Sequence, residues 1–191
     1  LEYNQNDFEI SFLTAIQNQY TNIIEYYFEN IIKTGQFKIR QKFAFQILNI
    51  AIEEQLNSIF VYLLNNFIDI NHNITFHLNE FNSLLVTLCQ KNNFELVKII
   101  TNLIIKFNPK EDLTNAFLEA AKINSIEICK YILDQKAYIN IDEIASNASK
   151  LGSINQEIFT SMSDHCENDE KKILQHCFFE PAIQSSNRSL I

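Results

Sequence analysis

Two His-Cys dipeptides, His165-Cys166 and His176-Cys177, are the residues in this chain whose types best suit metal chemistry. Imidazole nitrogen and thiolate sulfur are both ligands that zinc accepts. On one continuous helix the two dipeptides would share a face, but they would lie about 16 Å apart at a rise of 1.5 Å per residue. Zinc bonds at about 2.0–2.3 Å, so one ion could join them only if the chain turned back at 167–169. We expect instead a last helix whose apolar side chains face the rest of the fold, namely Ile173, Leu174 and Cys177.

Other reactive residue types lack the partners that catalysis needs. Gly35 and Gly152 are isolated, whereas loops that bind phosphate need several glycines close together. The carboxylates of Glu53-Glu54 and of the segment 167–170 would point apart along a helix instead of facing each other across a cleft. Cys89 and Cys129 fall at small or apolar positions of a repeat, where we expect buried thiols and not nucleophiles. The sequence therefore predicts no catalytic residue, no cofactor and no metal, and hence a chain that is not an enzyme.

A repeated frame with uneven steps about a period near 33 residues runs along the chain. In each copy a small or apolar pair is followed by a polar turn and then by an apolar stripe at helical spacing. The clearest copy is Ala120–Leu133, and others begin at Ala15, Ala51 and Leu88, with a weaker one at Ala148. The frame predicts helix–loop–helix pairs whose second helices are Asn22–Ile32, Ser58–Phe67, Phe94–Lys106 and Ile126–Gln135. It also predicts a buried set, which is Leu63, Leu64, Ile99, Ile100, Ile128, Ile132 and Leu133.

The segment Asn124–Leu133, which reads Asn-Ser-Ile-Glu-Ile-Cys-Lys-Tyr-Ile-Leu, resembles the second helix of an ankyrin repeat, and Asn93–Ile100 is similar. Ala137–Asn140 and Ile68–Asn71 look like the segment that follows this helix in the family. Over roughly 12–159 the resemblance implies an all-α solenoid of ankyrin-like helix–loop–helix pairs.

The chain also departs from the ankyrin pattern. The Thr-Pro-Leu-His start of the first helix is absent, and 83–86 and 115–118 occupy its place. Of the glycines that join the two helices of each ankyrin repeat, only Gly152 is present. In two other copies Asn92 and Asn124 occupy this position, and asparagine also adopts the left-handed conformation. The β-hairpin fingers lack their Asp and Gly and are expected to be lost or irregular. The alternatives are a solenoid of the HEAT or tetratricopeptide kind and an irregular helical bundle.

Composition and spacing predict the organisation of the chain. Two glycines and two prolines in 191 residues favour helices over folds that need many tight turns, and a hydrophobic content of 47% is enough for a core. We expect a repeat array of about four to five repeats at 1–160, a C-terminal capping helix at 161–183 and a flexible tail at 184–191. The tail ends in Ser189-Leu190-Ile191, which resembles a ligand for a PDZ domain.

The resemblance implies a protein-interaction module, a scaffold or adaptor that binds a protein partner on its concave face. One alternative is a regulatory segment of a larger enzyme, such as a kinase, whose catalytic domain lies outside this chain. Another is a purely structural array. A net charge of −8 argues against nucleic acid, and no apolar run reaches the ~18 residues of a membrane helix. Four cysteines without a paired motif suggest free thiols, and so a cytoplasmic or otherwise intracellular protein.

In the ankyrin-like frame, one position before the small pair and two positions after it project toward the concave side. Glutamates among them would favour a partner with basic residues. The positions are Thr14, Gln17 and Asn18 in the first repeat; Ile50, Glu53 and Glu54 in the second; Thr87, Gln90 and Lys91 in the third; and Glu119, Lys122 and Ile123 in the fourth.

Overall fold

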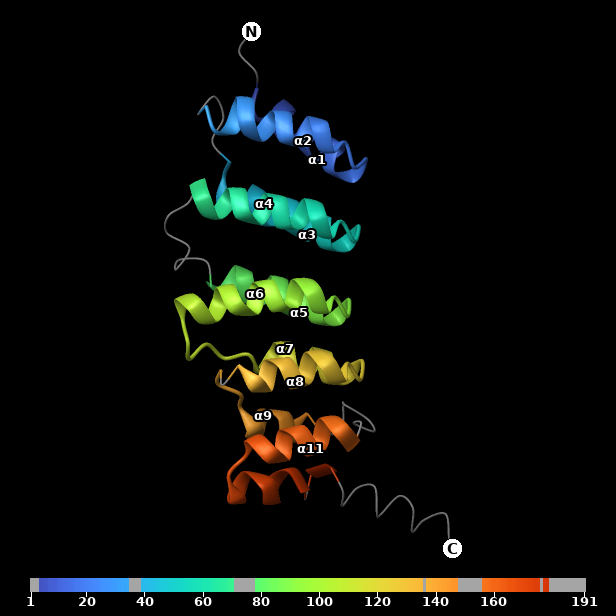
Figure 1. The fold of residues 1–191 in the computed structure, drawn as a ribbon, viewed down its shortest axis with the longest axis vertical. Helices are drawn as coiled ribbons and strands as arrows, with labels where there is room; N and C mark the ends of the chain where they lie inside the picture. The colour runs from blue at the N-terminus through green and yellow to red at the C-terminus, as the bar shows by residue number, and fades with distance from the viewer. Residues whose placement is uncertain are drawn as a thin grey trace, which may run out of the picture. The chain divides into compact units, whose positions relative to one another are not determined.

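The computed structural model describes residues 4–34, 39–70, 78–135, 137–147, 156–175 and 177–178. The regular elements in these ranges are helices (Figure 1), which confirms the predicted all-α class. Within the same ranges, β-type pairing is limited to an isolated parallel bridge between Asp112 and Tyr138. The chain divides into two compact units, Leu1–Glu80 and Phe81–Ile191.

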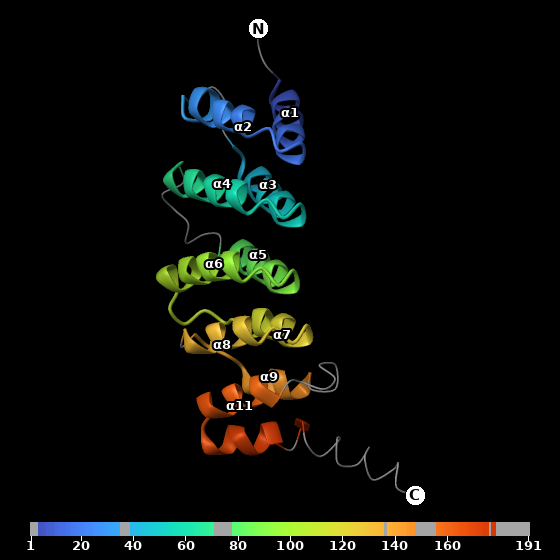
Figure 2. The same ribbon diagram turned by 45° about the vertical axis from the view of Figure 1, so that its right-hand side comes forward.

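The first unit contains two helical pairs (Figure 2). Helix α1 (Gln5–Gln17) pairs with α2 (Thr21–Tyr27), which continues into a π-helical turn η1 (Phe28–Ile32). Helix α3 (Gln41–Glu53) pairs with α4 (Asn57–Ile70) and also packs against α1. Phenylalanine rings fill the core, and Phe28 lies 5.6 Å from both Phe12 and Phe67, measured between ring centroids. The abundant phenylalanine therefore supplies the burial that stabilises these pairs.

The second unit begins inside α5 (Leu78–Gln90) and continues with α6 (Phe94–Phe107). Helix α7 (Thr114–Lys122) then pairs with α8 (Ile126–Asp134), which also packs against α6 and α11. After α9 (Ile141–Ser146) and α11 (Gln156–His165), helical residues resume at 168–175 and 177–178. The predicted second helices therefore match the observed ones to within three residues at each end, provided that η1 is counted with α2.

The turn inside each of four helical pairs has the same backbone geometry. A residue with positive φ ends the first helix, and these residues are Gln19 (59°), Gln55 (57°), Asn92 (55°) and Asn124 (54°). In the turn between α3 and α4, the N–H of Gln55 donates to the carbonyl of Ile52 at 3.1 Å, and the N–H of Leu56 donates to the carbonyl of Ala51 at 2.8 Å. The other three turns repeat this pair of bonds, which defines a Schellman cap.

These caps begin at the residues where the sequence frame begins, which are Ala15, Ala51, Leu88 and Ala120. The asparagines Asn92 and Asn124 adopt the predicted left-handed conformation. The start of the weaker fifth copy, from Ala148 through Gly152, lies outside the described residues.

Most of the predicted core is buried. Leu63, Leu64, Ile100, Ile128, Ile132 and Leu133 are at most 5% exposed. Ile99 is half-buried, so its prediction is wrong. Consecutive helical residues point 100° apart, and of this pair Ile100 faces the core while Ile99 lies at its edge. The predicted burial of Ile173 is wrong for the same reason, because the adjacent Leu174 is buried while Ile173 is exposed.

The C-terminal helix runs through 168–175 and 177–178, inside the range predicted for the capping helix. The boundary expected between 160 and 161 falls within α11, and the predicted tail 184–191 lies outside the described residues.

An irregular connector leads into α7. The N–H of Leu113 donates to the carbonyl of Tyr138 at 3.0 Å, beside the bridge between Asp112 and Tyr138. The buried hydroxyl of Thr114 accepts a hydrogen bond from the N–H of Asn140 at 2.7 Å. Two connectors of the second unit are thus joined by main-chain and side-chain bonds without a regular strand.

Candidate binding surface

The predicted partner-binding positions lie at the C-terminal ends of the first helices and in the turns that follow. The Schellman cap fixes them there, because it reverses the chain directly after the first helix. Each of them is exposed or half-buried, and the half-buried ones are Ile50, Thr87 and Glu119. Their side chains are accessible, as a binding surface requires.

At the end of α1 local hydrogen bonds hold two of the predicted side chains. The hydroxyl of Thr14 donates to the carbonyl of Ile10 at 2.9 Å. The amide of Asn18 donates to the carbonyl of Thr14 at 2.8 Å, and Asn18 is also the C-cap residue. Gln17, between them in sequence, is exposed. These bonds order the end of α1 before any partner binds.

Glu53 and Glu54 lie together at the end of α3 and are both exposed. The carboxyl end of a helix carries a partial negative charge, so two carboxylates there are unfavourable for the helix itself. Helix stability therefore does not account for this acidic pair, and a cationic group that approached it would be attracted by both carboxylates.

In the second unit, the structure brings three predicted residues from two helical pairs into one hydrogen-bonded chain. The amide of Gln90 donates to Glu119 at 3.0 Å, and Lys122 forms an ion pair with the same carboxylate. Partial burial opposes ionisation of Glu119, but the hydrogen bonds from Lys122 and Gln90, together with the charge of Lys122, lower its pKa. Glu119 is thus an anion that is already paired within the protein.

A second bond joins the same two pairs at their turns. The hydroxyl of Ser125 donates to the amide oxygen of Asn92 at 2.6 Å. Lys91 and Ile123 are exposed beside these turn residues, and Ile123 is 43% exposed. The end of α5, the end of α7 and their turns therefore form one connected polar surface with Ile123 as an apolar member.

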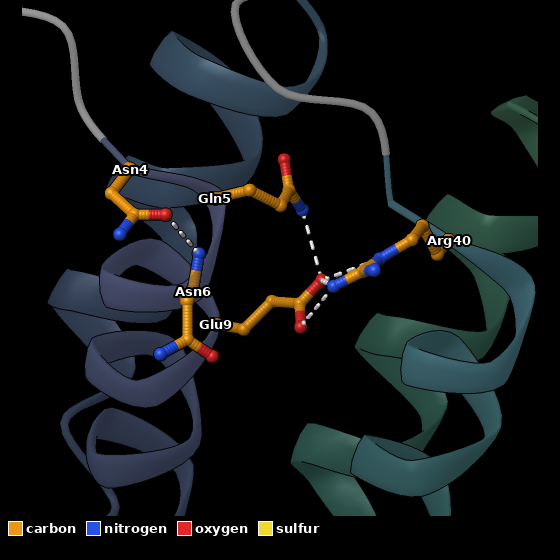
Figure 3. Close-up of polar contacts among 5 residues, drawn as sticks. All are labelled: Asn4, Gln5, Asn6, Glu9 and Arg40. Carbon is orange, nitrogen blue, oxygen red and sulfur yellow. Dashed lines mark hydrogen bonds and ion pairs between the residues drawn. The ribbon is translucent and has the colours of Figure 1, made fainter.

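On α1 the sequence reasoning missed two features. Glu9 accepts hydrogen bonds from Gln5 at 2.9 Å and from the Nε and Nη2 atoms of Arg40 at 2.7–3.0 Å (Figure 3). Burial opposes ionisation here as well, but the hydrogen bonds from Gln5 and Arg40 and the charge of Arg40 lower the pKa of Glu9. This clamp ties the start of α3 to α1.

The other missed feature is Ile10, which is 55% exposed one turn before Thr14. The sequence signal was available, because Ile10 falls off the buried stripe of α1, which is Phe8, Phe12, Ala15 and Ile16. An exposed apolar side chain among polar ones is a suitable contact for a protein partner.

Three of the four cysteines are buried thiols, which are Cys89, Cys129 and Cys166. Burial raises the pKa of the Cys89 and Cys129 thiols to about 12 and that of Cys166 to about 11, which suppresses their thiolates. In the part of the chain that the structure describes, no three His, Cys, Asp or Glu residues come together to hold a metal ion. His176 lies outside that part, so the arrangement of the two His-Cys dipeptides is not observed.

A shallow depression of about 710 Å³ lies beside the connector that contains Tyr138, and His165 is at its rim. The Nδ1 atom of His165 is 2.7 Å from the carbonyl of Ser161, and its Nε2 atom is 3.5 Å from Asp134. The hydroxyl of Ser161 donates to the carbonyl of Glu157. Both ring nitrogens of His165 therefore face oxygens that are not nucleophiles, so this arrangement does not activate Ser161.

Comparison with protein-family models, with curated proteins and with solved structures finds no match to this chain. Among the described helices, none has both the length and the apolar character to span a membrane. The function of the chain is therefore inferred from the geometry of its own residues.

Proposed function

We propose that this chain is a protein-interaction module, a scaffold or adaptor built from ankyrin-like helical pairs. The observation that carries the proposal is the Schellman turn, which recurs in four pairs and in the frame of the sequence repeat. Repeated pairs of this kind bury their apolar stripes against neighbouring pairs and leave a broad surface for partners.

Bonds between successive pairs support the same proposal. Ser125 contacts Asn92, and Tyr131 contacts Lys98, in each case at a separation of 33 residues, which is the ankyrin period. The hydroxyl of Tyr131 also donates to Asn102 at 2.9 Å. In the second unit these bonds therefore join neighbouring pairs, and each links a residue to the position one beyond its equivalent in the next copy of the sequence frame.

The binding surface that we propose comprises the ends of the first helices and their turns. In the first unit its charge comes from Glu53 and Glu54, and Ile10, one turn before Thr14 in the middle of α1, adds an apolar contact beside it. Because Glu53 and Glu54 are exposed whereas Glu119 is half-buried, we assign the attraction for a basic partner mainly to the acidic pair on α3. Association with such a partner should weaken as salt is added.

The first step of the test is affinity capture with the whole chain carrying a photo-crosslinking residue at Gln17. A second version carries it at Asn22, which is exposed on the second helix of the same pair. A partner that crosslinks from Gln17 and not from Asn22 supports the proposed surface. Equal crosslinking from both sites would contradict it.

The second step measures affinity for the captured partner at two salt concentrations. The charge reversal Glu53→Lys with Glu54→Lys should weaken binding, and more so at low salt. The control is Glu25→Lys with Glu29→Lys, which makes the same change of charge on the second helix of the first pair. Unchanged affinity in the first variant, with its circular dichroism intact, would exclude this site.

A further inference from the structure

A pocket of about 230 Å³ lies between the second helices of the first unit, α2 and α4. Its apolar lining consists of Ile24 and Ile59, which are 1% and 8% exposed. Polar side chains complete the lining, and they are Thr21 and Glu25 on α2 and Ser58 and Tyr62 on α4. Sites for drug-sized ligands measure about 300–1,000 Å³, so this pocket suits a smaller molecule.

The equivalent interface of the second unit, between α6 and α8, indicates which group fits this place. Positions counted from the Schellman cap match Thr21 with Phe94 and Tyr62 with Tyr131. The ring of Phe94 meets the ring of Tyr131 edge-on, at 5.7 Å between centroids. In the first unit Thr21 offers no ring, and Tyr62 meets Phe28 edge-on instead, at 5.6 Å. The pocket therefore lies at the position that a phenylalanine ring fills in the second unit.

Phenylalanine and threonine exchange positions between the two units. The fully buried Phe28 is matched in the frame by the fully buried Thr101, just as Thr21 is matched by Phe94. The first unit therefore carries its ring about two helical turns further along the second helix. Because Phe28 already supplies the aromatic contact to α4, the core of the first unit is packed without any group in the pocket.

The charge beside the pocket is opposite to the charge at the equivalent place in the second unit. There, Lys98 lies over the Phe94 ring, with its Nζ atom 4.7 Å from the ring centroid. The residue equivalent to Lys98 in the first unit is Glu25, which is exposed. Glu25 makes no hydrogen bond or ion pair with the described residues, so its carboxylate is available to a ligand. A ring that enters this pocket would therefore be favoured by a positive substituent instead of a positive neighbour.

The pocket also offers a hydrogen-bonding group that the second unit uses internally. The hydroxyl of Tyr131 donates to an asparagine side chain at 2.9 Å, whereas the hydroxyl of Tyr62 has no partner among the described residues. Burial raises the pKa of Tyr62, and the negative charges of Glu29 and Glu25 raise it further. Lys33 opposes this effect but is the weakest of the four causes. The surroundings of this hydroxyl are thus mainly acidic, and a cation that donates hydrogen bonds would find acceptors here.

We propose that the pocket between α2 and α4 binds a small organic cation, which is a single aromatic ring that carries a positively charged, hydrogen-bonding substituent. The ring lies between Ile24 and Ile59, at the place that Phe94 occupies in the second unit, and the substituent reaches the Glu25 carboxylate. The net charge of −8 attracts a cation over a longer range. This site goes beyond the proposed function, because none of its residues belongs to the predicted partner-binding positions.

The probe is benzamidine, which combines one phenyl ring with a planar cation. Added to the isotope-labelled whole chain, it should shift the backbone NMR signals of the pocket residues, with a dissociation constant of about 1 mM or lower. Benzyl alcohol, which has the same ring without a charge, should bind about tenfold more weakly or worse, and benzoate should not bind. Equal affinity for benzamidine and benzyl alcohol would overturn the proposal, and so would signal shifts confined to residues outside the pocket.

An arginine side chain of a partner protein also carries a planar cation. N-acetyl-arginine amide presents that cation on a flexible chain without a ring, so it should bind more weakly than benzamidine. Tighter binding than that of benzamidine would show that the pocket receives a side chain, and it would refute the assignment to a small aromatic molecule.

Two substitutions with matched controls test the site itself. Thr21→Phe gives the first unit the ring that the second unit has, so it should abolish benzamidine binding, whereas Thr160→Phe on the exposed side of α11 should not. Glu25→Gln should raise the dissociation constant by about fivefold or more, because it removes the carboxylate that pairs with the cation. Its control is Glu127→Gln, an exposed position on α8, which should leave the dissociation constant unchanged.

Circular dichroism of each variant checks that the helices remain. If Thr21→Phe does not fold, Glu25→Gln and Glu127→Gln decide the question, because both replace an exposed side chain by one of the same shape. Benzamidine binding that a folded Thr21→Phe retains would refute the site, and so would an equal loss of affinity in Glu25→Gln and Glu127→Gln.

Discussion

Replacing Gln55 by glycine should make this protein more stable, although it removes a whole side chain. Gln55 has a φ of 57°, and the left-handed conformation costs a residue with a Cβ atom roughly 1–2 kcal/mol. Glycine avoids this cost, but its unfolded chain gains freedom, which costs roughly 0.5–1 kcal/mol. The difference predicts a gain of about 0.5–1 kcal/mol in the free energy of unfolding. The side chain of Gln55 is exposed, so little packing is lost.

Two neighbouring substitutions serve as controls for this prediction. Gln55→Ala keeps the Cβ atom and should therefore gain little. Glu54→Gly acts one residue earlier, where φ is −84°, so glycine there should lower stability by roughly 0.5–1 kcal/mol.

The measurement is equilibrium unfolding in urea, in which stability changes shift the midpoint at constant slope. Gln19→Gly tests the same reasoning at φ 59°, and its gain should add to that of Gln55→Gly because the two turns are separate. If Gln55→Gly were as destabilising as Glu54→Gly, the left-handed conformation would not be the source of strain at this turn.

Three further predictions concern the second unit. Ile132→Ala should lower the free energy of unfolding by about 2–5 kcal/mol, because Ile132 is fully buried. In the same urea unfolding assay Ile99→Ala should cause a much smaller loss, because Ile99 is only half-buried. Thr101→Val should leave the free energy of unfolding unchanged or raise it by about 1 kcal/mol, because the buried hydroxyl of Thr101 has no hydrogen-bond partner among the described residues. A clear loss of stability in the urea assay would mean that this hydroxyl does form a hydrogen bond. Because the folded state lowers the pKa of Glu119, its carboxylate contributes stability above the ordinary glutamate value of 4.5, and this contribution is lost as the pH falls through the lowered pKa. The variant Glu119→Gln should therefore have a lower free energy of unfolding than the unchanged chain at pH 7, and this difference should shrink as the pH is lowered to 3. A difference that stays constant between pH 3 and pH 7 would contradict this assignment.

The hydrophobic period was sufficient to predict the second helices. Helix α6 begins at Phe94 as predicted, and α8 ends at Asp134, one residue before the predicted end. The apolar stripe and the polar turn residue determine these bounds together, because the cap must follow the last buried turn of the first helix.

Other features of the fold depend on tertiary packing. Glutamine has no local preference for positive φ, so Gln19 and Gln55 were not recognisable as cap residues in the way that Asn92 and Asn124 were. The π-helical turn after α2 also has no residue signature in Phe28–Ile32. Each of these backbone states is imposed by the packing of the pair around it.

The candidate site is less predictable than the fold. The bond from Gln90 to Glu119 joins residues from two pairs, and neither side chain indicates this partner in the sequence. Ile10 was overlooked because the family frame marks the end of α1 and not its middle turn. Polar residues at exposed positions are equally suited to solvent and to a partner, so residue type alone cannot distinguish binding from solvation.

The short span of the bonds between helical pairs has a consequence for how the chain folds. In the part of the chain that the structure describes, side-chain bonds between different helices or their connectors, such as Arg40–Glu9, Gln41–Glu80, Lys130–Glu157 and Asn140–Thr114, connect residues 26 to 39 positions apart. Loops of that length close at small entropic cost, and folds with mainly local contacts form quickly. During synthesis, α1 to α4 could therefore assemble while the residues from α7 onward were still being added.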